Sequence, residues 1–227
     1  MRRTLLATAL VLGVVMAGCG GDDDDGDAES ADAPSDESVE IGGVAEAGGP
    51  DAWPAPPAEE RLALAETAGV PFDVQEHLAH HVHAHLDVFI DGEHRTVPAG
   101  IGIDIDSPDV KDFDDNGVVG YGGIEQCAEP CISALHTHDP TGVLHTESPE
   151  ASENTLGQFF TEWDVTLDGD CVGEYCTDET AIAVYVDGEE VPLADAADIA
   201  LTNAKEIAIV IGDPPSRIPD EGDFSQA

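Results

Sequence analysis

The chain has 227 residues, in which seven Lys and Arg side chains stand against 49 Asp and Glu side chains, for a formal charge of −42. Nucleic acids and anionic lipid surfaces attract basic proteins, so this composition argues against both as electrostatic partners. The length allows one domain with additional segments at its ends.

The first 19 residues have the pattern of an export signal. Arg2 and Arg3 precede an apolar stretch over residues 5–16, which is too short to span a bilayer in a mature protein. Residues 16–19, Met-Ala-Gly-Cys, resemble the bacterial lipobox, except that its first position is usually leucine. The resemblance implies a lipid on Cys19 and a membrane-anchored protein on the extracytoplasmic face. An ordinary secretory signal or an uncleaved anchor is the alternative.

Residues 20–57 are expected to form a disordered acidic tether. They contain too few apolar residues to offset the loss of chain entropy on folding, and their charges repel and extend the chain. Acidic residues remain dense through the rest of the chain, as in proteins of salt-loving organisms. In dilute buffer such charges repel one another and destabilise the fold.

Residues 58–74 are expected to hold a short helix and a linker. The helix covers residues 58–69, where Leu62, Ala65 and either Ala68 or Gly69 form a weak apolar stripe. Gly69 fits the end of the helix, and Pro71 follows as a stop signal.

The first strand is predicted over residues 81–90. Its even-numbered positions are all apolar, whereas its odd-numbered positions include three histidines and Asp87. This period of two is typical of a half-buried strand. Residues 91–92, Asp-Gly, predict a hairpin turn, and a return strand is expected over residues 95–103, with Pro98 at an edge or a bulge.

An acidic, glycine-rich segment over residues 104–126 follows. Residues 112–117 match the first half of a calcium-binding loop, but Gly123 occupies the place of its bidentate glutamate. An acidic turn is therefore favoured over a calcium site.

A second hairpin is predicted from a strand over residues 132–138, a turn at 139–142 and a return strand over 143–147. This arrangement brings His136, His138 and His145 near one another, because side chains directly opposite each other across strands lie about 5 Å apart.

The next segment predicts an amphipathic helix packed on the sheet. Thr155 and Gln158 form a capping box, and the helix carries an apolar stripe that ends at Trp163. For Trp163, core packing is favoured over stacking on a ligand. Strands are expected over 181–186, 191–193 and 206–212. The fold class is α+β: a mainly antiparallel β-sheet with hairpins and one packed helix, over residues 75–215, followed by a tail at 216–227.

Four cysteines remain once Cys19 is assigned to lipid. An even number in an exported protein indicates two disulfides, and the most local of the three possible pairings is Cys127–Cys131 with Cys171–Cys176. Ligation of soft copper(I) by Cys127 and Cys131 is the competing interpretation, since they lie next to a His-x-His strand.

Histidines at alternate strand positions indicate a metal site, because each imidazole offers one nitrogen to an ion such as zinc or copper. If the two His-x-His strands are neighbours with matching faces, their imidazoles converge, and the return strand adds His145. The candidate ligands are His81, His83, His85, His136, His138 and His145. Three carboxylates could orient the rings or bind the ion directly: Asp87, Asp139 and Glu147. An exposed polar face or a pH-sensitive network is the alternative to a metal site.

Two segments carry a family resemblance. Residues 83–92, His-Ala-His-Leu-Asp-Val-Phe-Ile-Asp-Gly, and residues 135–148, which include Leu-His-Thr-His-Asp, are similar to a functionally uncharacterised family of exported bacterial proteins. The resemblance covers about residues 77–215 and implies a shared domain, with no activity attached. The Asp in His-Thr-His-Asp comes one position too early for the H-x-H-x-D-H motif of metallo-β-lactamase-type hydrolases.

Three functions are compatible with these patterns: a lipid-anchored protein that captures, buffers or delivers zinc or copper, a mononuclear zinc hydrolase or hydratase, and a structural or pH-responsive surface domain. The first is favoured. No G-x-S-x-G nucleophile motif occurs in the chain.

Overall fold

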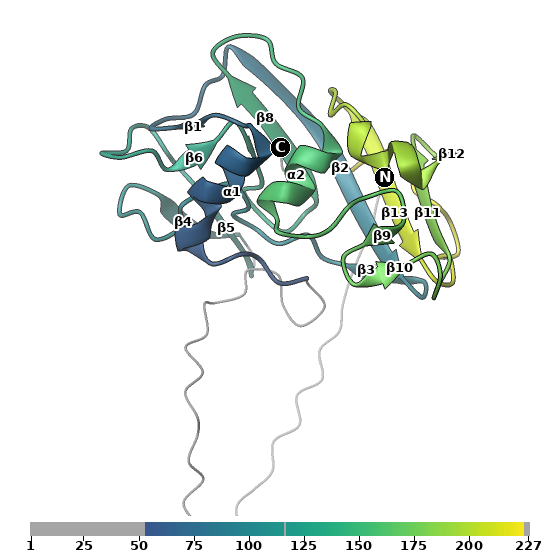
Figure 1. The fold of residues 1–227 in the computed structure, drawn as a ribbon. Helices are drawn as coiled ribbons and strands as arrows, with labels where there is room; N and C mark the ends of the chain where they lie inside the picture. Colours follow the sequence, from purple (N-terminus) through teal and green to yellow (C-terminus); the bar gives the residue numbers. More distant parts are fainter. Residues whose placement is uncertain (1–52, 116, 225–227) are drawn as a thin grey trace, which may run out of the picture. The chain divides into compact units, whose positions relative to one another are not determined.

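The fold is organised around β2 (His80–Ile90), an 11-residue strand that confirms the first predicted strand. The structure is a computed structural model that describes residues 53–115 and 117–224, and the predicted signal, Cys19 and most of the tether lie outside these ranges. β2 belongs to a seven-stranded sheet, mostly antiparallel, with helices packed on it, which confirms the α+β class (Figure 1).

The sheet extends from β2 in both directions. On one side lies β13 (Lys205–Ile211), parallel to β2, followed by β11 (Ile182–Val186) and β12 (Glu189–Val191). On the other side, the first half of β2 pairs with β8 (Val143–Ser148), and its second half pairs with the shorter strand of the Asp-Gly hairpin. β2 is therefore an interior strand along most of its length.

One face of the sheet is the hydrophobic core. The apolar positions of β2 lie on this face, under α2 (Leu156–Glu162), which begins with the predicted capping box of Thr155 and Gln158. Trp163 is buried, with its ring centroid 5.5 Å from that of Trp53, so its role is core packing. This packing leaves the histidine-bearing face of β2 pointing away from α2.

A second helix, α1 (Arg61–Ala68), follows the short turn η1 (Ala58–Glu60) and packs against α2 (Figure 1). Gly69 ends it with a φ of 71°, as predicted. The predicted apolar stripe is wrong at Leu62, which is exposed; Arg61 is buried instead and donates to the carbonyls of Gly100 and Ile103. The packed domain therefore includes residues on the N-terminal side of 75.

The predicted return strand over residues 95–103 is wrong. The strand β3 (Glu93–Arg95) ends early, because Pro98 has no backbone N–H to donate and Gly100 adopts a φ of 74°. The rest of the segment is a buried loop tied to Thr137: Gly100 N donates to the Thr137 carbonyl, and the Thr137 hydroxyl donates to the Pro98 carbonyl. These hydrogen bonds hold the loop against the second hairpin.

The strand predicted over residues 132–138 is divided in two. β6 (Ile132–Ser133) pairs with β1 (Phe72–Asp73), whereas β7 (Leu135–His136) joins the main sheet beside β8. The break falls at Ala134, whose N–H donates to the Pro71 carbonyl outside the sheet.

The turn of this second hairpin lies very close to β2. Gly142 has a φ of 88°, its carbonyl accepts from Leu86 N at 2.9 Å, and a Cβ at this position would lie 2.6 Å from the Leu86 carbonyl oxygen. Only glycine fits both the conformation and the space. Gly142 therefore allows β8 to enter the sheet directly beside β2.

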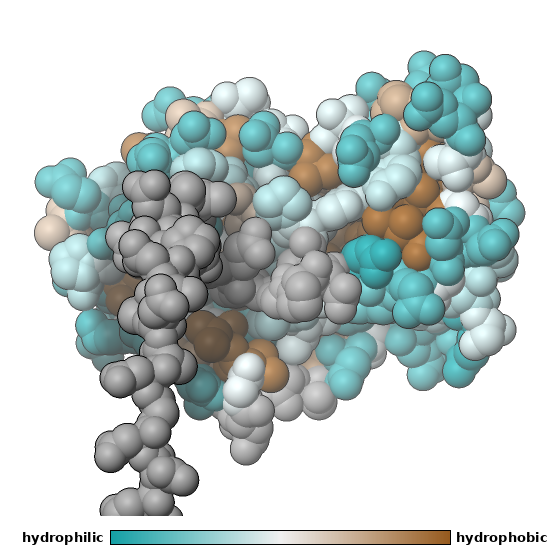
Figure 2. Space-filling model, turned by 90° about the horizontal axis from the view of Figure 1, so that it is seen from below, coloured by the Kyte–Doolittle hydropathy of each residue, from teal (hydrophilic) through white to brown (hydrophobic). Residues whose placement is uncertain are grey.

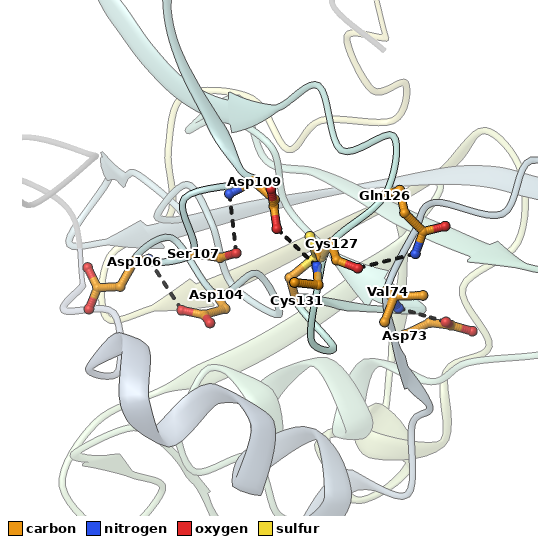
Figure 3. Close-up of a disulfide and its surroundings, with 10 residues drawn as sticks. Asp73, Val74, Asp104, Asp106, Ser107, Asp109, Gln126, Cys127 and Cys131 are labelled. Carbon is orange, nitrogen blue, oxygen red and sulfur yellow. Dashed lines mark hydrogen bonds between the residues drawn. A yellow bond between two sulfur atoms is a disulfide. The ribbon is translucent and has the colours of Figure 1, made fainter.

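Two disulfides join Cys127 to Cys131 and Cys171 to Cys176, as predicted, so these cysteines are not metal ligands. The first lies in a loop held by polar contacts, including one from Ala128 N to the Asp109 carboxylate (Figure 3). The second joins β9 (Cys171–Val172) to β10 (Tyr175–Cys176).

The remaining elements can be compared with the predictions for the acidic segment and for the strand over residues 191–193. The acidic segment forms a hairpin of β4 (Lys111–Asp115) and β5 (Val118–Gly122), in agreement with the favoured acidic turn. The strand predicted over 191–193 is instead the end of β12 followed by the 3-10 helix η2 (Leu193–Asp198).

The surface reflects the acidic composition. On the face in Figure 2, hydrophilic residues surround small hydrophobic patches in the part that is not grey. Among residues 53–115 and 117–224, no helix combines the length and the apolarity needed to cross a membrane.

Candidate metal centre

A row of three histidines crosses three neighbouring strands on the polar face of the sheet. His145 of β8 lies directly opposite His83 of β2 and also directly opposite His136 of β7. Their ring centroids are 4.4 Å apart for His83 and His145, and 5.3 Å apart for His136 and His145. The two His-x-His strands are not direct neighbours, so the condition stated for their convergence is not met; β8 lies between them and places His145 in the middle.

Three more side chains complete this group. His81 lies opposite Glu147 on the neighbouring strand, with Nε2 3.0 Å from Glu147 Oε1. His138 follows β7 directly, and its ring centroid lies 4.6 Å from that of His145. We call the following residues the histidine centre: His81, His83, His136, His138, His145 and Glu147.

The hydrogen bonds of two rings fix which nitrogen faces the centre. His136 Nδ1 lies 2.9 Å from the Ser133 carbonyl oxygen, and His138 Nδ1 lies 2.6 Å from the Tyr121 carbonyl oxygen. A carbonyl oxygen can only accept, so both Nδ1 atoms carry protons, and in a neutral ring Nε2 then has a free lone pair. These two Nε2 atoms lie 3.2 Å apart. Two lone pairs at this distance repel each other unless a proton or a metal ion lies between them.

Burial keeps most of these rings neutral. Desolvation lowers the pKa of His136 well below its ordinary value and lowers the pKa of His145 as well. Burial and the neighbouring imidazoles lower the pKa of His83 to about 4. Burial opposes the charge on Glu147, but contacts with His145 and His81 lower its pKa overall. The centre thus combines neutral nitrogen ligands with an ionised carboxylate, the protonation states that metal binding requires.

The ligand atoms of the centre form two overlapping groups in which all atoms lie within 4.8 Å of one another. One comprises His136, His138, His145 and Glu147, and the other comprises His81, His83 and His145. Around a tetrahedral zinc ion with bonds of about 2.0 Å, neighbouring ligand atoms lie about 3.3 Å apart. The separation of 3.2 Å between His136 Nε2 and His138 Nε2 fits this geometry without rearrangement.

A pocket of about 110 Å³ opens beside the centre. His136 and Glu147 form part of its wall, together with apolar residues such as Pro71, Ile132 and Ala134. Glu147 Oε2 is buried without a hydrogen-bond partner among the residues that the structure describes. A small molecule or a water could therefore reach the centre from this side.

The other predicted site residues lie elsewhere. His85 is separate from the histidine centre and contacts Asp87 and Glu206 instead. Asp139 accepts from Thr141 N at 2.9 Å and stabilises the hairpin turn. Of the predicted carboxylates, only Glu147 joins the histidine centre.

Two acidic residues at these sites were not predicted. Burial raises the pKa of Glu76, which lies close enough to His138, Glu147 and His81 for their charges to act on it. Nothing in the sequence around Glu76 indicates this position. Glu206 carried a signal: it is the carboxylate of β13, where it precedes a run of apolar residues and lies on the face opposite to Ile207.

Comparisons of the chain with protein-family models, with curated proteins and with solved structures found no match. The family resemblance of the two histidine motifs stays a prediction, and the functional argument proceeds from the geometry of the centre.

Proposed function

We propose that this protein binds zinc or copper(II) at the histidine centre and serves to capture, buffer or deliver the ion on the extracytoplasmic side of a membrane. The observation that carries the proposal is the approach of His136 Nε2 and His138 Nε2 to 3.2 Å, while a backbone carbonyl holds the Nδ1 of each ring. A metal ion between them would be bound by both nitrogens.

The donor set favours borderline divalent ions. Imidazole nitrogen suits zinc and copper(II), and copper(II) binds such a site more tightly by the usual order of divalent affinities. Soft copper(I) prefers sulfur ligands, but the cysteines next to the second hairpin, Cys127 and Cys131, are joined in a disulfide. One rim of the centre is open, because His81 is exposed, and this supports exchange of the ion with a carrier.

The test is calorimetric titration of zinc and copper(II) into protein purified without a histidine tag. The wild type should bind either ion at micromolar concentration or below, and the double variant His136→Ala/His138→Ala should lose that site. The matched control is His80→Ala, which removes a histidine of β2 that belongs to neither ligand group. A folded wild type that binds neither ion at micromolar concentration refutes the proposal.

The pocket supports a second candidate, a mononuclear zinc hydrolase. Three histidine ligands leave a fourth position for a metal-activated water, and Glu147 beside the pocket would accept its proton. Zinc-loaded wild type would then hydrolyse small activated esters, and Glu147→Gln would lose this activity. This candidate is excluded if the wild type and Glu147→Gln hydrolyse the ester at equal rates. It is also excluded if the zinc-loaded wild type is no faster than free zinc.

The proposed location depends on Cys19, which lies outside the described residues. Lipidation at Cys19 would tether the domain to the membrane through the acidic segment that follows it. Cys19→Ser should release the protein into the soluble extracellular or periplasmic fraction. Unchanged membrane association and processing of this variant would point to another anchor.

A further inference from the structure

The polar face of β2 continues beyond the histidine centre into a second group of ligand-type side chains. His85 lies directly opposite Glu206 across the parallel pairing of β2 with β13, and both side chains are buried. His85 Nδ1 lies 2.9 Å from Glu206 Oε2 and 3.8 Å from Asp87 Oδ2. One nitrogen and one oxygen from each of the two carboxylates all lie within 4.8 Å of one another.

The orientation of the His85 ring directs its Nδ1 at these carboxylates. His85 Nε2 lies 2.9 Å from the Thr141 carbonyl oxygen, which can only accept, so Nε2 carries a proton. Nδ1 therefore faces the oxygens of Asp87 and Glu206, where it donates a proton to Glu206 when no cation is bound and offers its lone pair when one is. A backbone carbonyl that fixes one nitrogen while the other binds the ion is the usual arrangement of a metal-ligating histidine.

Glu206 supplies an independent indication of a ligand. Its side chain is fully buried, and its second oxygen, Oε1, has no hydrogen-bond partner among the described residues. A buried carboxylate oxygen without a partner is costly, and a cation satisfies it. His94 meanwhile fixes the other oxygen of Asp87, with Nε2 2.8 Å from Oδ1.

The C-terminal segment covers this group. A Cβ at Gly222 would lie 2.6 Å from His85 Cβ and 2.8 Å from Glu206 Oε2, so only glycine allows the backbone to pass so closely. The ring of Phe224 meets that of His85 edge-on, with centroids 6.1 Å apart. The cover restricts water at the group and strengthens the attraction between the carboxylates and a cation.

We propose that His85, Asp87 and Glu206 form a second cation site, independent of the histidine centre, for a divalent first-row ion such as manganese or zinc. The ligand set has one nitrogen and two carboxylates, which is harder than the imidazole-rich set of the histidine centre and favours ions that accept oxygen ligands. The competing arrangement is a purely structural ion pair between protonated His85 and Glu206, with no metal.

The test uses the double variant His136→Ala/His145→Ala, which removes ligands from both groups of the histidine centre because His145 belongs to each of them. Equilibrium dialysis against manganese or zinc should retain one ion per chain in this background, and adding Glu206→Gln should remove it. The matched control, Glu189→Gln, removes an exposed carboxylate of β12. Unchanged binding after Glu206→Gln, or no binding in the double variant, overturns the second cation site. If the histidine centre binds no ion, the wild type and the double variant retain the same number of ions per chain. That outcome refutes the proposed function and leaves the second cation site standing.

A measurement on the wild type needs no substitution. Crystals grown with zinc or manganese should show an anomalous scattering peak between His85, Asp87 and Glu206. Crystals with no peak there at millimolar metal contradict the proposal, whatever is bound at the histidine centre.

Discussion

Replacement of Glu162 by glutamine should stabilise the protein, and the gain should grow with pH. Glu162, at the end of α2, is buried; its Oε1 accepts from Ser133 Oγ at 2.8 Å, and Oε2 has no partner among the described residues. Burial raises the pKa of Glu162 from an ordinary value of 4.5 to about 8. The folded protein therefore keeps this proton at pH values at which the unfolded chain releases it.

The magnitude follows from the linkage between protonation and folding. Below pH 4.5 both states of the wild type are protonated at Glu162, and no stability is lost. Between pH 4.5 and pH 8 the unfolded state alone ionises, so each pH unit lowers the free energy of unfolding by about 1.4 kcal/mol. From pH 5 to pH 7 the wild type should lose about 3 kcal/mol relative to Glu162→Gln, which does not titrate.

The assay is urea denaturation of both proteins from pH 5 to pH 7, in constant high salt with a chelator, and Glu189→Gln is the matched control. The difference in free energy of unfolding between Glu162→Gln and the wild type should rise steadily across this range. A constant difference would show that Glu162 is already ionised in the folded protein and would refute the reasoning.

Three further predictions concern metal binding and stability. Because burial lowers the pKa values of His83, His136 and His145, zinc binding at pH 6.5 should release fewer protons from them than the roughly 1.5 expected of three ordinary histidines. Calorimetry in buffers of different protonation enthalpy counts these protons, and a release of 1.5 or more from these rings contradicts the prediction. The melting temperature should rise with added salt, as the Debye length shrinks from about 30 Å at 0.01 M to 3 Å at 1 M; a melting temperature that is flat or falls with salt argues against charge repulsion as the destabilising force. Thr155→Ala should lower the free energy of unfolding by about 1 kcal/mol, since it removes the cap of α2; a loss below about 0.3 kcal/mol in urea denaturation would show that the cap adds little.

The sequence predicted the parts of the site that depend on local pattern. Alternation along β2 placed His81 and His83 on one face, and the turn before β8 brought His145 opposite His136. These features follow from the strand period of two and from turn chemistry, which act over a few residues.

What the sequence could not supply is the lateral order of the strands. Nothing local shows that β8 lies between β2 and β7, or that β13 pairs with β2 in parallel. The consequence was to group His85 with the other histidines, although its neighbour across the sheet is Glu206. The loop after β3 was misjudged for a related reason, because its backbone hydrogen-bonds to the distant Thr137 and not to a neighbouring strand in a ladder.

The pairing of β2 with β13 has a consequence for the order of folding. Glu206 lies 121 positions after His85, so their strands can meet only after almost the whole chain is free to fold. Contacts between residues so distant in sequence form late, because the entropy of closing a long loop is lost before the contact is gained. A chain that lacks residues 205–211 can still pair β2 with β8, but one flank of β2 stays open and His85 lacks its partner Glu206. The group of His85, Asp87 and Glu206 should therefore acquire an ion only after β13 has docked, whereas the histidine centre needs only β2, β7 and β8.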